Sequence, residues 1–185
     1  ADYLAVVDCD PTSETYSTVV HRQYGTAPGD ELHHFAWSAC ASCHDDPSKE
    51  RRYLVIPGLA SARIYIMDTK DPRKPVMHKV IEPEEVLEKT NLTAGHTVHC
   101  LADGTVMIVM LGEGDGAAPG GYLLLDEEFN VKGRWEKQGK DVQRMTYSYD
   151  FWYQPSHNVM LSSGWGAPST FAPGFNPADV AAGKY

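Results

Sequence analysis

The chain has 185 residues, of which 42% are hydrophobic and 22% charged, a composition that is ordinary for a globular domain with a sizeable core. Its net charge of -9 and isoelectric point near 5.3 argue against a nucleic-acid or anionic-membrane partner, because both repel an acidic surface. No apolar run approaches the roughly 18 residues of a membrane-spanning helix, so no membrane span is expected.

The four cysteines are too few for a disulfide scaffold in a chain of this length. The sequence opens ADYLAVVDCD, with no Met, basic segment or leader. The compartment therefore stays open between the cytoplasm and, if a leader has been removed, the periplasm.

Short β-rich runs dominate the chain, and Asp, Gly, Pro or Asn separate them. One segment, EPEEVLEKTNL, predicts a helix, because it has an early proline, acidic residues in its first turn and a lysine near its end. The predicted strands are 3–8, 17–24, 33–38, 52–57, 62–68, 76–81, 97–102, 105–111, 121–126, 130–136, 147–153 and 158–163.

Three of these strands share a pattern, an aromatic and apolar run that ends in aspartate. The runs YLAVVD, RIYIMD and GYLLLD end at Asp8, Asp68 and Asp126, which are 60 and 58 residues apart. A repeat of this length that holds about four strands is typical of propeller blades. We therefore expect an all-β fold, a β-propeller with about three blades in this chain. The alternative is a complete β-sandwich whose periodicity is accidental.

The blade count bears on domain organisation, because propellers close with about 4 to 8 blades. An open arc would leave sheet faces and edges uncovered at both ends. We therefore expect residues 1–185 to be the N-terminal portion of a single propeller domain, with the missing C-terminal blades as its structural partner.

Two histidine pairs fall on the strands that the repeat places nearest the central axis. His33 and His34 lie in HHFAW, and His96 and His99 lie in HTVHC. Neighbouring residues of a regular strand point to opposite faces, so we expect one histidine of each pair to face the axis, and Gly95 allows an irregular backbone that would bring in a second. Clustered imidazoles suit copper, zinc or iron, and a nearby thiolate favours copper or zinc. The alternative is that each histidine only hydrogen-bonds backbone or water.

The cysteines allow several chemistries. Cys40, Cys43 and the histidine that follows match the haem-attachment pattern C-x-x-C-H, although here the motif lies in a loop of a β-repeat protein. A structural zinc site needs a second ligand pair at finger-like spacing, and none follows. A dithiol at Cys40 and Cys43 is the simplest reading. Cys100 and His157 are candidate neighbours of a metal, and an ordinary buried cysteine is the alternative for Cys100.

The sequence also resembles the selenium-binding protein / methanethiol oxidase family along essentially its whole length. The motifs that carry the resemblance include DELHHFAWSACASC, RYLVIPGLASARIYIMDT, HTVHCLADGTVMI, YDFWYQPSHNVM and GFNPADV. The resemblance implies a seven-bladed propeller of which this chain forms the N-terminal two-fifths. It also implies copper as cofactor, with His33, His34, His96 and His99 among the metal ligands and Cys40 and Cys43 as a selenium- or thiol-binding pair.

The resemblance further implies an activity. Enzymes of the family are copper-dependent methanethiol oxidases, which convert methanethiol, O₂ and water to formaldehyde, hydrogen sulfide and hydrogen peroxide. The partners are then a small thiol and O₂. The catalytic residues stay unknown. One alternative is a non-catalytic propeller module that binds selenium or a soft metal on Cys40 and Cys43, and another is a purely structural scaffold.

Overall fold

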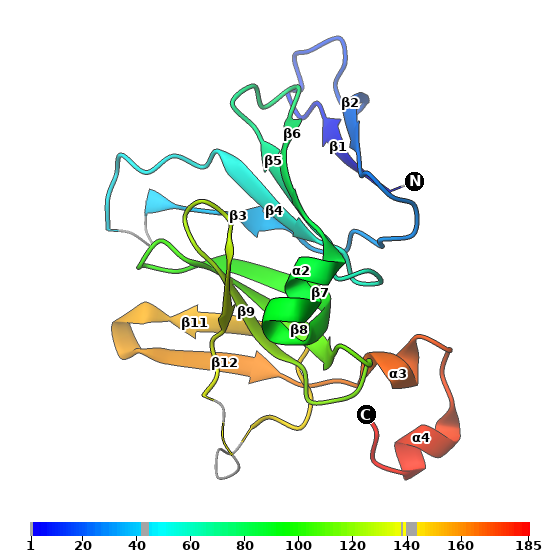
Figure 1. The fold of residues 1–185 in the computed structure, drawn as a ribbon. Helices are drawn as coiled ribbons and strands as arrows, with labels where there is room; N and C mark the ends of the chain where they lie inside the picture. Colours follow the sequence, from blue (N-terminus) through cyan, green and yellow to red (C-terminus); the bar gives the residue numbers. More distant parts are fainter. Residues whose placement is uncertain (1, 42–44, 138, 140–143) are drawn as a thin grey trace.

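The structure is a computed structural model, and it describes residues 2–41, 45–137, 139 and 144–185. It confirms the all-β class, with low helix content and several antiparallel sheets (Figure 1). All twelve predicted strands are present, eleven with shifted ends and the strand at 76–81 with the predicted ends. The strands are β1 Tyr3–Val7, β2 Val19–Tyr24, β3 Ala36–Trp37, β4 Tyr53–Pro57, β5 Ile64–Asp68, β6 Val76–Ile81, β7 Leu92–Cys100, β8 Val106–Glu113, β9 Gly121–Leu125, β10 Val131–Arg134, β11 Asp150–Gln154 and β12 Val159–Ser163.

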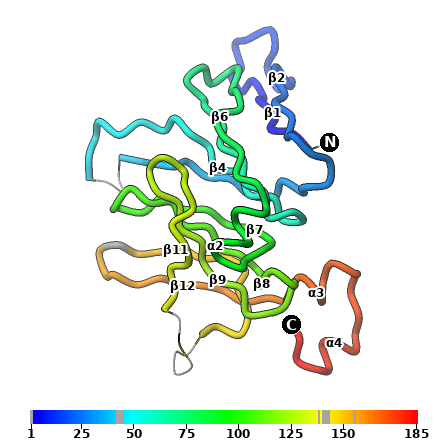
Figure 2. Tube along the Cα trace, viewed as in Figure 1, coloured from blue at the N-terminus to red at the C-terminus, as the bar shows by residue number. Residues whose placement is uncertain are grey.

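The strands form two four-stranded sheets and two hairpins, all antiparallel. One sheet has the order β3-β4-β5-β6 and the other the order β7-β8-β9-β10, so each is a meander in chain order. The hairpins are β1-β2 and β11-β12. The first strands β3, β7 and β11 lie together, because β7 contacts both β3 and β11. Figure 2 shows the chain passing through the four units in sequence, from the β1-β2 hairpin to the β11-β12 hairpin.

The helix predicted from EPEEVLEKTNL is α2, Pro83–Thr90. Pro83 begins it, Glu84 and Glu85 occupy its first turn, and Lys89 binds Glu85 at 2.8 Å. Asn91 ends the helix in the left-handed conformation at φ 52°. The sequence did not predict a short 3-10 helix at Pro155–His157 or two helices of four and five residues, α3 Pro168–Phe171 and α4 Pro177–Ala181. None of the helices in the described ranges has the length and apolarity needed to cross a membrane.

The apolar cores lie between successive sheets. Alternate residues of β8 face different cores: Ile108 packs against the β3–β6 sheet, and Val109 packs towards Phe151 of β11. In β5, Ile66 belongs to the same core as Ile108, whereas Tyr65 packs in a third core with Leu4 of β1. Because both faces of β5 and β8 are buried, their sequences are nearly continuous apolar runs. The four units therefore stack face to face in chain order.

Two departures from regular strand geometry position the histidines. The predicted strand 33–38 forms only over Ala36–Trp37, because residues 33–35 make no strand pairing and Leu32 forms an isolated bridge to Gly58. In β7 the register shifts between Gly95 and Val98, where three steps oppose two on β8. The irregular backbone expected at Gly95 is present. A β-carbon at Gly95 would lie 2.7 Å from the Pro57 side chain, so glycine is required there.

Candidate metal centre

Three of the predicted histidines meet at one point. The ring centroids of His33 and His34 are 4.6 Å apart, and His96 lies 4.8 Å from the first and 4.2 Å from the second. One nitrogen from each ring can be chosen so that all three lie within 4.8 Å of one another. His33 and His34 are exposed, and His96 is buried. The group could therefore hold a metal ion. Its members come from the segment before β3 and from the bulge of β7.

A buried ion pair anchors the segment that carries His33 and His34. The Asp30 carboxylate, 1% exposed, accepts hydrogen bonds from Arg63 and from the Tyr65 hydroxyl. The backbone is fixed as well, because Ala60 N–H donates to the Asp30 carbonyl at 3.0 Å and Leu59 N–H donates to the Glu31 carbonyl at 3.0 Å. The two histidines therefore emerge from backbone that is tied to the β4–β5 connection, although they lie outside a strand.

His96 has the properties of a neutral metal ligand. Its side chain is 1% exposed, and its Nε2 has no hydrogen-bond partner among the residues that the structure describes. Its Nδ1 lies 3.0 Å from Thr97 Oγ1, and an Nδ1–H donated to this hydroxyl leaves the lone pair on Nε2. Burial, and then the neighbouring His34 and His33, lower the pKa of His96 to about 4. Burial, and then His33, lower the pKa of His34 as well.

These properties predict an acid-sensitive contribution of His96 to stability. Between pH 6.5 and about 4, the unfolded chain protonates His96 while the folded, metal-free protein keeps it neutral. The free energy of unfolding should therefore fall as the pH drops through this range, by at most about 1.4 kcal/mol per pH unit. Urea unfolding at pH 7 and pH 5 measures this loss, and a His96→Leu variant should lose less. Equal losses in both proteins would show that His96 titrates normally.

The fourth predicted ligand, His99, lies outside the cluster. Its Nε2–H donates to the Phe151 carbonyl at 3.0 Å, and its ring packs against Trp152 at 4.5 Å between centroids. Burial lowers the pKa of His99, and the Phe151 carbonyl partly offsets this. His157 is exposed at the end of the 3-10 helix between β11 and β12. In the described part of the chain, His157 does not belong to the group of histidines that could hold a metal.

The predicted cysteine sites are only partly described. Cys43 lies outside the described residues. Cys40 and Cys100 lie together, with their sulfur atoms 3.6 Å apart. Among the described residues, the group of three histidines includes no cysteine. No local pattern predicts this contact, because Cys40 and Cys100 are 60 residues apart.

Two cavities flank the cluster. His34, His99, Cys40 and Cys100 line one of about 700 Å³. His33 and His96 line the other, of about 560 Å³, whose wall includes aromatic rings. These rings belong to Tyr149, Trp165 and Phe171, and the Tyr149 ring lies 4.5 Å from that of His96. Sequence analysis missed Thr97 and Tyr149 as neighbours of His96. Thr97 stands inside the HTVHC motif, but no spacing signal connects Tyr149 to it.

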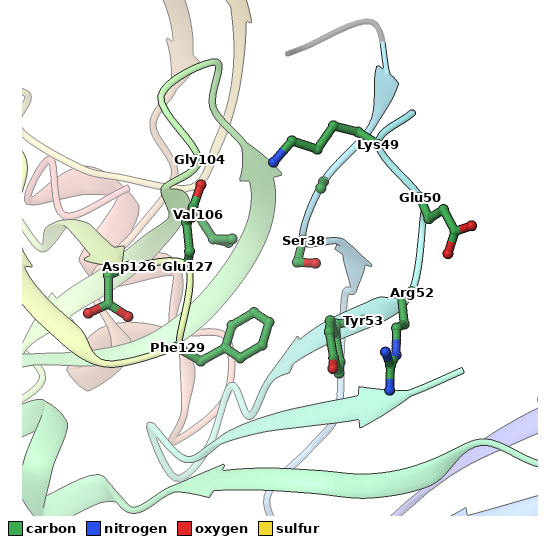
Figure 3. A pocket seen from close by; sticks show the side chains of 11 residues that line it. Ser38, Lys49, Glu50, Arg52, Tyr53, Gly104, Val106, Asp126, Glu127 and Phe129 are labelled. Carbon is green, nitrogen blue, oxygen red and sulfur yellow. The ribbon is translucent and has the colours of Figure 1, made fainter. Parts of the chain in front are cut away.

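A third cavity, of about 270 Å³, lies between the two four-stranded sheets, and none of the three clustered histidines lines it (Figure 3). Figure 3 shows Tyr53 and Phe129 facing this space, and their ring centroids are 5.3 Å apart. Arg52 lies over the Tyr53 ring and pairs with Asp68 at 2.7 Å. Arg52 therefore has structural partners, and we assign the cavity no role.

The comparisons with known proteins decide the family. The family model of the 56 kDa selenium-binding proteins matches residues 1–185. The chain belongs to this family. Selenium-binding protein 3 of Arabidopsis thaliana is 55% identical over the whole chain, and a methanethiol oxidase of Xenopus laevis is 52% identical. The chain covers 38% and 39% of these two proteins, so it spans about two-fifths of their length.

A solved structure agrees with the 56 kDa selenium-binding protein assignment. The crystal structure of a hypothetical selenium-binding protein from Sulfolobus tokodaii matches with a TM-score of 0.88 at 46% identity. The match covers 97% of this chain and 40% of the other. The family resemblance read from the HHFAW, HTVHC and YDFWY motifs is thus confirmed.

Proposed function

We propose that this chain is the N-terminal part of a copper-dependent methanethiol oxidase. The observation that carries the proposal is the convergence of three imidazoles, one of them buried with an unpartnered Nε2. Relatives at about half identity are named methanethiol oxidases, which connects this site to thiol oxidation. The reaction is the one in which methanethiol, O₂ and water give formaldehyde, hydrogen sulfide and hydrogen peroxide.

The fold proposed for the whole protein is a β-propeller. In support, each four-stranded meander has the form of one blade, and the first strands β3, β7 and β11 lie together as inner strands would. The hairpins β1-β2 and β11-β12 then represent half blades, which makes about three blades in total. Trp152 and Leu161 are 69% and 73% exposed on the last hairpin, as expected of a sheet that a further blade covers. Residues 1–185 are then the N-terminal portion of one domain.

The residues present fit a copper ion. His33, His34 and His96 offer three nitrogen ligands, and copper binds imidazole more tightly than the other divalent metals of its row. When bound, copper supplies the electron transfer that thiol oxidation by O₂ requires. The lowered pKa values of His34 and His96 keep both rings neutral near pH 7, which is the form that binds a metal.

The other residues of the two cavities have proposed roles in binding and proton transfer. The aromatic wall of Tyr149, Trp165 and Phe171 offers an apolar surface for the methyl group and excludes water beside His96. His99 lines the opposite cavity, and its Nε2–H is committed to the Phe151 carbonyl. Its Nδ1 is therefore the lone-pair atom of the neutral ring, and we assign it as acceptor of the thiol proton.

The activity test uses the full protein that contains this chain, because the chain covers only about two-fifths of its relatives. The copper-loaded protein, supplied with methanethiol and O₂, should release sulfide and peroxide in equal amounts. The copper-free protein should release neither, and adding copper back should restore both. Copper-loaded protein that produces neither product would end the oxidase proposal.

A second candidate function is non-catalytic binding of selenium or a soft metal on Cys40 and Cys43. The relatives named selenium-binding proteins favour it. Incubation with selenite, followed by gel filtration and selenium analysis, separates the two functions. Selenium retained by the wild type and lost from a Cys40→Ser variant, together with no thiol oxidation, would support binding alone.

A further inference from the structure

Two cysteines that are far apart in sequence lie next to each other, one beside each of two neighbouring sheets. Cys40 lies in the segment after β3, and Cys100 is the last residue of β7. Their sulfur atoms are 3.6 Å apart. Figure 2 shows the segment after β3 and the β7–β8 turn on the same side of the molecule, and β3 contacts β7. The two thiols therefore belong to neighbouring units of the fold.

The separation is short enough for a covalent bond after a small movement. A disulfide needs about 2.0 Å between the sulfurs, so the two atoms must approach by about 1.6 Å from the observed 3.6 Å. Cys100 is fixed in a strand and 8% exposed, whereas Cys40 is half-buried outside any strand. The movement can therefore come from the Cys40 side. Both residues line the cavity of about 700 Å³, which gives a small oxidant access to them.

We propose that Cys40 and Cys100 are a redox modification site that forms a reversible disulfide with hydrogen peroxide as oxidant. In the first step, one thiolate attacks a peroxide oxygen, the O–O bond breaks, and a sulfenic acid and hydroxide result. In the second step, the other thiolate attacks the sulfenic sulfur, and the S–S bond forms as hydroxide leaves. The two protons of the thiols and the two hydroxides make two waters. The two sulfurs are oxidised by two electrons, and the peroxide is reduced by two.

This pairing differs from the one that spacing suggests. The C-x-x-C pattern places Cys43 three residues from Cys40, so the sequence favours a local dithiol. In the described part of the chain, the fold places Cys100 against Cys40. The proposal does not depend on the oxidase activity, because added peroxide serves as the oxidant. If the proposed reaction occurs, its own peroxide is a second source beside the same cavity.

The bond would change the cavity that His34 and His99 line. It would join the segment after β3 to the end of β7, and these are two of the elements that form the cavity wall. A small thiol in excess would reverse the change by thiol–disulfide exchange. The site therefore links the thiol and peroxide concentrations around the protein to the shape of its larger cavity.

Peptide mapping of the full protein tests the proposal without relying on activity. The protein is freed of metal with a chelator, treated with hydrogen peroxide, alkylated with N-ethylmaleimide and digested with trypsin without reduction. Cleavage after Lys and Arg places Cys40 and Cys43 in peptide 23–49, Cys100 in peptide 90–132 and Cys9 in peptide 1–22. We expect a species that joins peptides 23–49 and 90–132 and disappears on treatment with dithiothreitol.

A Cys43→Ser variant decides which cysteine is used and serves as the matched control. The joined species should persist in this variant and be absent from Cys40→Ser. Its loss in Cys43→Ser would assign the bond to Cys43 and overturn the proposal. Two results in the wild type would also overturn the proposal, and neither depends on how the variants fold. One is a disulfide confined to peptide 23–49. The other is that N-ethylmaleimide still alkylates Cys40 and Cys100 at peroxide doses that oxidise the exposed Cys9.

Discussion

Replacing His96 by alanine should weaken copper binding at least about 100-fold. His96 is the buried member of the three-histidine cluster, and its Nε2 has no other partner among the described residues. Removing it leaves His33 and His34, which are exposed. The site then lacks its third nitrogen ligand. It also lacks the buried ligand position, where exclusion of water strengthens metal binding. Competition of the full protein against a copper chelator of known affinity measures the change.

Two control variants make this result specific. His78 lies on β6 against Tyr53, away from the cluster, and His78→Ala should leave copper affinity unchanged. His99→Ala should also retain copper, because the structure places His99 against Phe151 and Trp152. A loss of copper in His99→Ala comparable to that in His96→Ala would restore His99 as a ligand. Wild-type affinity in His96→Ala would remove the cluster as the copper site.

Replacing Asp30 by alanine should destabilise the protein by about 3 kcal/mol. Asp30 is 1% exposed and pairs with Arg63, which is itself largely buried. Its loss leaves the guanidinium with Glu82 alone, so we expect the lower end of the range for a broken buried pair. The Tyr65 hydroxyl, fully buried, loses its acceptor as well. Urea unfolding measures the change.

The same variant should also weaken copper binding, by about 10- to 100-fold. Asp30 stands three residues before His33, and its ion pair fixes the backbone from which the two exposed histidines emerge. Asp179→Ala is the matched control, because Asp179 binds the exposed Lys184 at the surface and its loss should cost at most about 1 kcal/mol. If Asp30→Ala changes stability no more than Asp179→Ala does, Asp30 does not anchor the segment.

The repeated strands could be predicted because their signal is local. The runs that end at Asp68 and Asp126 correspond to β5 and β9, and the apolar run of β8 could be read directly. Strand ends were less accurate where tertiary contacts decide them. The clearest case is the segment at His33, which does not pair as a strand. It is held instead by the isolated bridge between Leu32 and Gly58 and by the ion pair of Asp30 with Arg63.

The sequence predicted which residues belong to the site better than it predicted how they are arranged in space. The motifs HHFAW and HTVHC placed the histidines on neighbouring units, and three of the four meet. His99 stays apart from His96 although the register shifts between Gly95 and Val98, so the irregular backbone that Gly95 indicates does not bring a second histidine of this pair into the cluster. The contact of Cys40 with Cys100 has no local signal, because it arises from the packing of two sheets.

Anomalous diffraction from crystals of the copper-loaded full protein tests the central claim most directly. Data collected on both sides of the copper absorption edge locate the ion independently of any assumed ligand. We expect one strong peak bonded to the Nε2 atom of His96 and to a ring nitrogen of both His33 and His34. A peak on the sulfur atoms of Cys40 and Cys100, with none at the three imidazoles, would contradict the account.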